Sequence, residues 1–177
     1  MLKNFALRLL IVTAVLAAPA IALAAAAITS PIQVSASVAQ TCSIATTKEL
    51  VFGAYDPVGT NASTAATATA TLSVACSKSS STTLSIGLSD GLHATSGQRA
   101  MQGATATDKL NYDLFWPLAA GTCPGTTKWT NITPGLYLIP APPSKDVRTY
   151  NVCGVIPPNQ DVAVGTYNDT VTATINF

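Results

Sequence analysis

The chain has 177 residues, of which only 10% are charged, and its formal net charge is +1. A nearly neutral chain without a basic cluster lacks the electrostatic footprint of a nucleic-acid-binding protein. So few charges also protect a surface poorly against association, so assembly into something larger is compatible with the composition.

Residues 1–24 have the organisation of a secretory signal peptide. Lys3 and Arg8 precede an apolar run at residues 9–18, and Ala22-Leu23-Ala24 supplies a small-x-small cleavage pattern. We expect cleavage after Ala24, or one or two residues later. The alternative is a membrane anchor, for which the run is short. Cleavage would leave about 150 residues, enough for one domain with a real core, with a net charge near −1.

Residues 28–38 alternate in polarity, which is typical of a strand with one apolar face. The apolar side chains are Ile28, Ile32, Val34, Ala36 and Val38. Pro31 cannot donate to a ladder, so this is an edge strand or a strand that begins after the proline. It is either the first strand of the domain or a segment at the new N-terminus that pairs elsewhere.

Further alternating runs with turn signals between them continue to the end of the chain. They predict strands at residues 42–45, 49–55, 72–76, 82–89, 110–116, 135–139, 149–156 and 165–177, with 161–164 extended. Residues 92–108 have little apolar content and are interpreted as a connection that carries Arg99 and Met101. Because no convincing helical period follows the signal peptide, we expect an all-β chain folded as an antiparallel β-sandwich.

Four cysteines, Cys42, Cys76, Cys123 and Cys153, would remain after processing. In an exported protein an even number predicts two disulfides, and sequence alone allows three pairings. We prefer Cys42–Cys76 and Cys123–Cys153, each closing a loop of about thirty residues. A zinc site is the alternative, but no two cysteines have the spacing of a metal knuckle.

The sequence shows no motif for catalysis, a cofactor, a metal or a small-molecule substrate, so we do not expect an enzyme. His93 lies beside a turn and is interpreted as an exposed turn residue. The acidic residues stand singly, where caps and Asx-turns explain them. Five aromatic residues could line a sugar-binding face, but core or strand-pair roles are favoured: Tyr112, Trp116, Trp129, Tyr137 and Tyr150. Three weak N-glycosylation patterns begin at Asn61, Asn131 and Asn168.

Several motifs, taken in order, resemble the spore coat protein U domain family, which includes subunits of archaic chaperone–usher pili such as the Csu pilus. They are VAQTCSI at 38–44, LVFGAY at 50–55, LSVAC at 72–76, RAM at 99–101, LNYDLF at 110–115 with Trp129 downstream, VIPPNQ at 155–160 and GTYNDTVTATINF at 165–177. The resemblance covers essentially the whole chain after the signal peptide. The Cys123–Cys153 pair is an addition to the shared pattern.

The resemblance implies an immunoglobulin-like sandwich at residues 41–177 that lacks its last strand. The missing strand would leave a groove with exposed apolar core beside a final strand whose inward side chains are Val171, Ala173, Ile175 and Phe177. A periplasmic chaperone would fill this groove first. Residues 25–40 of the next subunit would then replace it as a donor strand.

The implied function is a structural pilus subunit that is exported through the periplasm to the cell surface by an outer-membrane usher. It would pair with other subunits and support adhesion and biofilm formation. Pro31 would remove one ladder bond, so the inserted part of the donor would begin near Ile32. Three alternatives remain: residues 28–38 folding back into their own domain, a self-contained extracellular or spore coat protein, and a carbohydrate-binding tip module.

Overall fold

The computed structural model describes residues 26–80, 83–118 and 122–177. The predicted signal peptide at residues 1–24 lies outside this part of the chain. The chain divides into two units, Met1–Ala36 and Ser37–Phe177. Within the first unit, residues 26–36 contain no helix or strand, and all of them are exposed. The segment expected to be a strand is therefore not one within this chain, because an isolated strand has no partner for its backbone.

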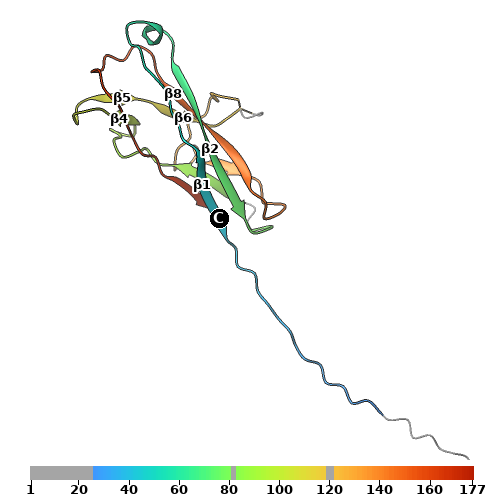
Figure 1. Cartoon of the computed structure of the whole chain (residues 1–177). Helices are drawn as coiled ribbons and strands as arrows, with labels where there is room; N and C mark the ends of the chain where they lie inside the picture. The colour runs from blue at the N-terminus through green and yellow to red at the C-terminus, as the bar shows by residue number, and fades with distance from the viewer. Residues whose placement is uncertain (1–25, 81–82, 119–121) are drawn as a thin grey trace, which may run out of the picture. The chain divides into compact units, whose positions relative to one another are not determined.

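The second unit consists of short antiparallel strands (Figure 1). They are β1 (Cys42–Lys48), β2 (Ala66–Cys76), β3 (Leu84–Leu88), β4 (Ala100–Gln102), β5 (Lys109–Asn111), β6 (Asp113–Phe115), β7 (Tyr137–Ile139), β8 (Arg148–Ile156) and β9 (Ala173–Asn176). The helical segment η1 (Thr60–Ala62) is a single 3₁₀ turn. No helix in the described residues is long and apolar enough to cross a membrane.

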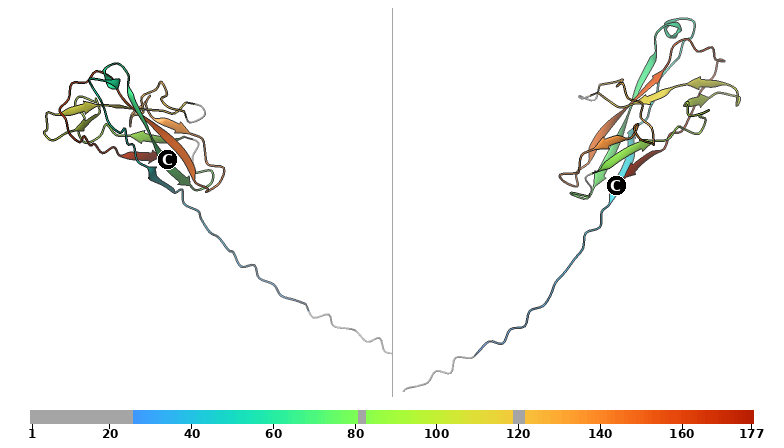
Figure 2. Two further views of the ribbon diagram at one scale, coloured as in Figure 1. Left: turned by 45° about the horizontal axis from the view of Figure 1, so that its top comes forward. Right: turned by 180° about the vertical axis from the view of Figure 1, so that it is seen from behind.

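The strands form two main sheets with a hairpin beside them. One sheet has the order β1-β2-β8-β6, the other has the order β7-β3-β9, and β4 pairs with β5. The views in Figure 2 show β9, in dark red, beside β3, in light green. This arrangement is the expected immunoglobulin-like antiparallel β-sandwich, with the first strand at the edge of one sheet and the last strand at the edge of the other.

The core lies between the sheets and follows the alternation of the longest strand. In β2, Ala70, Leu72, Val74 and Cys76 are buried, while the residues between them are partly exposed. In β3 all five residues are buried, because the strand has a neighbour on each side and is covered on both faces. Burial at period 2 in β2 is what the sequence pattern predicted.

One edge of the sandwich, between β6 and β7, is closed by a chain segment that bonds to both sheets. Trp129 N donates to Leu114 O on β6 (2.8 Å), and the Trp129 indole N–H donates to Ile86 O on β3 (2.8 Å). Leu88 N donates to Thr130 O (3.3 Å). Residues 127–130 therefore join the two sheets through hydrogen bonds, and we call this side the closed edge.

Both preferred disulfides are present. Cys42 on β1 is bonded to Cys76 on β2, and Cys123 is bonded to Cys153 on β8. The first joins two residues that face each other in the ladder. The second ties the loop that leads into the closed edge to β8.

Several predicted strand boundaries are wrong. Residues 110–116 form two strands, β5 and β6, which pair with different partners, so one continuous strand could not serve both. Residues 92–108 contain β4, whose partner is supplied by tertiary pairing rather than by its own pattern. Residues 49–55 and 161–164 are not strands, and the final strand extends over Ala173–Asn176 only. These last three segments border the same opening.

Candidate functional site

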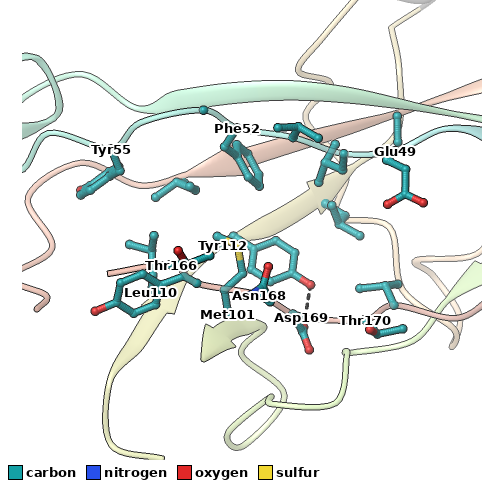
Figure 3. A pocket seen from close by; sticks show the side chains of 18 of the residues that line it. Glu49, Phe52, Tyr55, Met101, Leu110, Tyr112, Thr166, Asn168, Asp169 and Thr170 are labelled. Carbon is teal, nitrogen blue, oxygen red and sulfur yellow. Dashed lines mark hydrogen bonds between the residues drawn. The ribbon is translucent and has the colours of Figure 1, made fainter. Parts of the chain in front are cut away.

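The side of the sandwich between β1 and β9 is open and holds a groove of about 1050 Å³. One wall is formed by residues 49–57, which follow β1, and the other by residues 162–171, which lead into β9. We call these segments the N-terminal lip and the C-terminal lip, and this side the open edge. Figure 3 shows Phe52 and Tyr55 of the N-terminal lip opposite Thr166, Asn168 and Asp169 of the C-terminal lip.

The backbone of both lips is largely unpaired. Among the described residues, the main-chain groups of 49–55 and 161–167 make no hydrogen bond with another main-chain group. Val164 is fully exposed, and Val51 is 75% exposed. Unpaired donors and acceptors on two facing segments are what a strand placed between them would satisfy. Neither lip forms a strand in the described chain, because strand geometry requires a hydrogen-bonded neighbouring strand and residues 49–55 and 161–167 have none.

The floor of the groove is apolar and comes from both sheets. Its side chains include Ala70, Leu72, Leu88, Leu110, Leu114, Val152 and Ile156. All seven are buried, so the expectation of openly exposed core is wrong. The reason is that Leu50 and Phe52 of the N-terminal lip lean over β8 at Gly154, where a Cβ atom would come within 2.7 Å of each side chain. The lips thus partly cover the floor.

The two lips are tied together at one end of the groove. The Tyr55 hydroxyl donates to Pro157 O (2.9 Å) and accepts from Gln160 N (3.1 Å). The Gln160 side chain exchanges two hydrogen bonds with the backbone of Asn111, at 2.8 and 2.9 Å. The VIPPNQ motif at 155–160 therefore anchors the start of the C-terminal lip to the N-terminal lip and to β5.

A second anchor, centred on the buried carboxylate of Asp169, holds the C-terminal lip. Its Oδ1 accepts from Leu92 N (2.9 Å) and His93 N (3.2 Å) and lies 3.0 Å from His93 Nδ1, while its Oδ2 accepts from the Tyr112 hydroxyl (2.8 Å). Burial and the hydrogen bond to Asp169 raise the pKa of Tyr112 above its ordinary value, so the phenol keeps its proton. His93 lies in a turn as predicted, but its side chain is half-buried at 31% exposure, with its ring beside Asp169.

Arg99 is a buried residue that bonds residues 88–89 to Trp129, although its segment was predicted to be only a connection between strands. It is 3% exposed, and its guanidinium donates to Leu88 O, Ser89 O and Trp129 O at 2.8–2.9 Å. Burial lowers its pKa, and the nearby Tyr112 and three carboxylates oppose that shift. The RAM motif is the signal that could have identified it, because a charged residue beside strand residues must find partners when it is buried.

The predicted site residues have different environments. Val171 and Ala173 line the groove, Ile175 packs partly buried against the core, and Phe177 is 55% exposed. The five predicted donor side chains are exposed, with Ile28 at 98% and Ile32 at 87%. Four of the five aromatic residues pack on one another at the closed edge, as their expected core role requires. Their ring centroids are 5.5 Å apart for Trp116–Tyr137, 4.9 Å for Trp129–Tyr137 and 5.8 Å for Tyr137–Tyr150.

Few charged side chains line the groove. Its lining contains two charged side chains, Glu49 and Asp169, and Asp169 is already occupied by its four donors. Within residues 26–80, 83–118 and 122–177, no three His, Cys, Asp or Glu side chains are placed to hold a metal ion. The groove is suited to an apolar, uncharged chain.

Fold and site together define an immunoglobulin-like β-sandwich domain that is open along one edge. The Spore Coat Protein U domain profile matches residues 28–174, so the chain belongs to that family. Protein U of Myxococcus xanthus is 34% identical over 163 residues, which is 86% of this chain and 87% of that protein.

A solved structure has a similar fold. It is the CsuC–CsuE chaperone–tip adhesion subunit pre-assembly complex from archaic chaperone–usher Csu pili of Acinetobacter baumannii, with a TM-score of 0.55 and 22% identity. The match covers 79% of this chain but 40% of the chain in that structure.

Proposed function

We propose that this protein is a structural subunit of an archaic chaperone–usher pilus and polymerises by donor-strand exchange. The observation that carries the proposal is the open edge, where two facing lips with unpaired backbone flank an apolar floor. A strand inserted there would satisfy the backbone of both lips and complete the sandwich.

The occupant we propose is residues 28–38 of another subunit. This segment has eleven residues and the C-terminal lip has ten, so an extended chain would span the groove. It carries no charge and alternates apolar with polar side chains. Its apolar side chains Ile28, Ile32, Val34, Ala36 and Val38 would enter the groove, and Val171 and Ala173 would contact them from the receiving subunit.

The expected stabilisation is large. Four or five aliphatic side chains buried at about 1.5–3 kcal/mol each would make a strong junction before any backbone bond is counted. Pro31 would leave one ladder position unmatched, so the paired part begins near Ile32. Each subunit would give one strand and receive another, and such a contact propagates into a filament.

The route to the filament follows from the groove. A subunit with an open apolar groove needs a temporary occupant before it reaches a partner, and we propose a periplasmic chaperone for this role and an outer-membrane usher for assembly. The neighbouring Csu structure is by its own description a chaperone–subunit complex. The finished fibre would act at the cell surface in adhesion and biofilm formation.

A second candidate is an extracellular coat protein that completes its sandwich without an usher. It is favoured by the family's description as a Spore Coat Protein U domain and by the relative Protein U, of which this chain covers 87%. The two candidates differ in whether purified protein forms multimers that depend on residues 28–38.

The test compares the exported protein with two double variants, all purified from periplasm. Ile32→Asp/Val34→Asp places charges on the apolar face of the tail, and Gln33→Asp/Ser35→Asp places the same charges on the polar face. We expect a multimer ladder that persists in unheated denaturing gels, collapses on heating, and is lost only in the first variant. Equal ladders in both variants, or a monomer in all three proteins, would contradict strand exchange through this face.

A further inference from the structure

The C-terminal lip is held very unevenly along its length. At residues 162–167 its main-chain groups bond to no other main-chain group in the described structure, and Val164 is fully exposed. From Asn168 to Thr172, just beyond the end of the lip, the chain is bonded to β4, to residues 89–93 and to Tyr112. The difference lies within a single wall of the groove, on the segment that an incoming strand would have to pair with.

At both ends of this bonded stretch, at Asn168 and at Thr172, main-chain groups make the hydrogen bonds. Asn168 exchanges two main-chain hydrogen bonds with Gln102 of β4, at 2.8 and 3.1 Å. Thr172 N donates to the Ser89 hydroxyl (2.9 Å), and Ser89 N donates to Thr172 O (2.9 Å), which extends the β3–β9 ladder. Between these two points lies Asp169, whose side chain is only 2% exposed.

Asp169 reaches into the domain and collects donors from two different elements. The turn at residues 90–93 wraps around its carboxylate, and Gly91, with φ +90°, leaves the room that this needs, since a Cβ there would collide with Asp169 Oδ2. The other donor is the Tyr112 hydroxyl, between β5 and β6. Because an unpaired buried carboxylate is strongly disfavoured, the lip cannot leave this position without losing all four partners together.

Tyr112 also connects this anchor to the opposite wall. Its ring lines the groove and meets the Phe52 ring edge-on, with centroids 6.2 Å apart. Figure 3 shows Asp169 bonded to Tyr112 on the side of the groove that faces Phe52. The lip, the floor and the facing lip are therefore in contact through one phenol, and the spacing of the two walls depends on it.

We propose that Asp169 is a positioning residue for strand capture. By fixing the C-terminal lip to Tyr112 and the turn at residues 90–93, it keeps the vacant groove open at the width that an incoming strand needs. This inference rests on the proposed function. Preorganised sites bind faster and more tightly because less of the binding energy is spent on ordering them. Loss of the anchor allows the lip to settle on the apolar floor, which the strand must then reopen.

The test uses the whole exported chain carrying Ile32→Asp and Val34→Asp, so that its own tail does not compete for the groove. The probe is a fluorescent peptide with the sequence of residues 26–41. Into this parent we would introduce Asp169→Asn and, separately, Tyr112→Phe. The matched control is Asp108→Asn, which makes the same charge change at a carboxylate that accepts from Thr105 in a turn outside the groove.

Peptide association rate and Kd would be measured at a temperature where circular dichroism shows every variant folded. We expect Asp169→Asn to bind about tenfold more weakly, mostly through a slower association rate, and Tyr112→Phe to change in the same direction by less. Asp108→Asn should stay within about twofold of the parent. The unfolding midpoint of each variant is measured alongside.

The outcomes separate the two proposals. A parent that does not bind the peptide would contradict the proposed function itself. If the parent binds but Asp169→Asn binds as well as Asp108→Asn, the positioning role is wrong and strand capture stands. A lowered unfolding midpoint with unchanged Kd and association rate likewise shows a purely structural role and overturns the inference.

Discussion

Both edges of this sandwich are bordered by chain segments outside the strands, yet only one of them is closed. At the closed edge, residues 127–130 bond to β6 and to β3, and the side chain of Trp129 is fully buried. At the open edge, residues 49–57 and 162–171 flank a groove. A cluster of aromatic rings and the Cys123–Cys153 disulfide reinforce the closed edge, whereas the two lips of the open edge are held by hydrogen bonds at Tyr55 and Asp169 and by one ring contact between Phe52 and Tyr112.

The two edges differ in how much of their main-chain hydrogen bonding is completed within the described chain. In the described part of the closed edge, main-chain groups of Thr127, Trp129 and Thr130 are bonded within the chain, and the aromatic rings pack on one another. At the open edge, polar anchors fix the walls while the backbone between them remains available. Substitutions at the closed edge should therefore act on the unfolding free energy, and substitutions at the open edge should act mainly on assembly.

The largest loss of stability is expected for Trp129→Ala. Truncation of a fully buried tryptophan typically costs about 3–5 kcal/mol, and here it also leaves Ile86 O without its donor. Urea unfolding followed by circular dichroism would measure it. A loss below about 1 kcal/mol would show that the closed edge does not hold the sheets together.

Removal of the second disulfide should have the next largest effect. Cys123→Ser/Cys153→Ser frees a loop whose ends are 30 residues apart in sequence and should lower the unfolding free energy by about 2–4 kcal/mol. Multimer ladders should still form at low temperature, because neither cysteine lines the groove. If the double variant folds but no longer forms multimers, the disulfide at the closed edge also affects assembly at the open edge.

High pH should reduce the stabilisation that Tyr112 gives to the folded state, because the unfolded chain loses the phenol proton first. The pKa of Tyr112 is raised in the folded state, so its contribution is complete below the ordinary tyrosine pKa and is lost as pH rises beyond it. Above about pH 10 we expect this residue to add about 1.4 kcal/mol per pH unit to the fall in unfolding free energy. The pH dependence of unfolding should be shallower in Tyr112→Phe, and an unchanged slope would contradict the assignment.

A smaller effect is expected on β8 beneath the N-terminal lip. In Gly154→Ala the added methyl meets only the ends of the Leu50 and Phe52 side chains, which can move, so the cost should be about 1 kcal/mol. Displacement of the N-terminal lip would be detected as faster quenching of a tryptophan placed in it by Phe52→Trp, measured with and without Gly154→Ala. Equal quenching with and without the alanine would mean that Gly154 does not control the N-terminal lip.

The smallest effect on the unfolding free energy is expected in the tail. Ile32→Asp changes a side chain that is 87% exposed, so the unfolding free energy of the monomer should stay within about 0.5 kcal/mol of the unchanged chain. The same substitution should reduce multimer formation strongly. A large loss of monomer stability would indicate that the tail folds back into its own domain.

Much of the fold could be predicted because alternation is a local property. The periods of β2 and β8 predicted strands, and in β2 alternate residues are buried as expected. The even cysteine count predicted two disulfides, and the preferred pairing of Cys42 with Cys76 and of Cys123 with Cys153 is confirmed. The class of fold followed from many short strands with turns between them. The ordered motifs also predicted a groove beside the last strand.

Only the tertiary structure decided which alternating segments become strands. Residues 49–55 alternate as well as β1 does, but strand geometry needs a neighbour to bond with, and at the open edge the described chain supplies none. The partners of Arg99 and Asp169 were equally hidden, since each takes donors or acceptors from residues far away in sequence. Local periodicity determines which face of a strand is apolar, whereas pairing and burial of charge depend on contacts that only the folded chain creates.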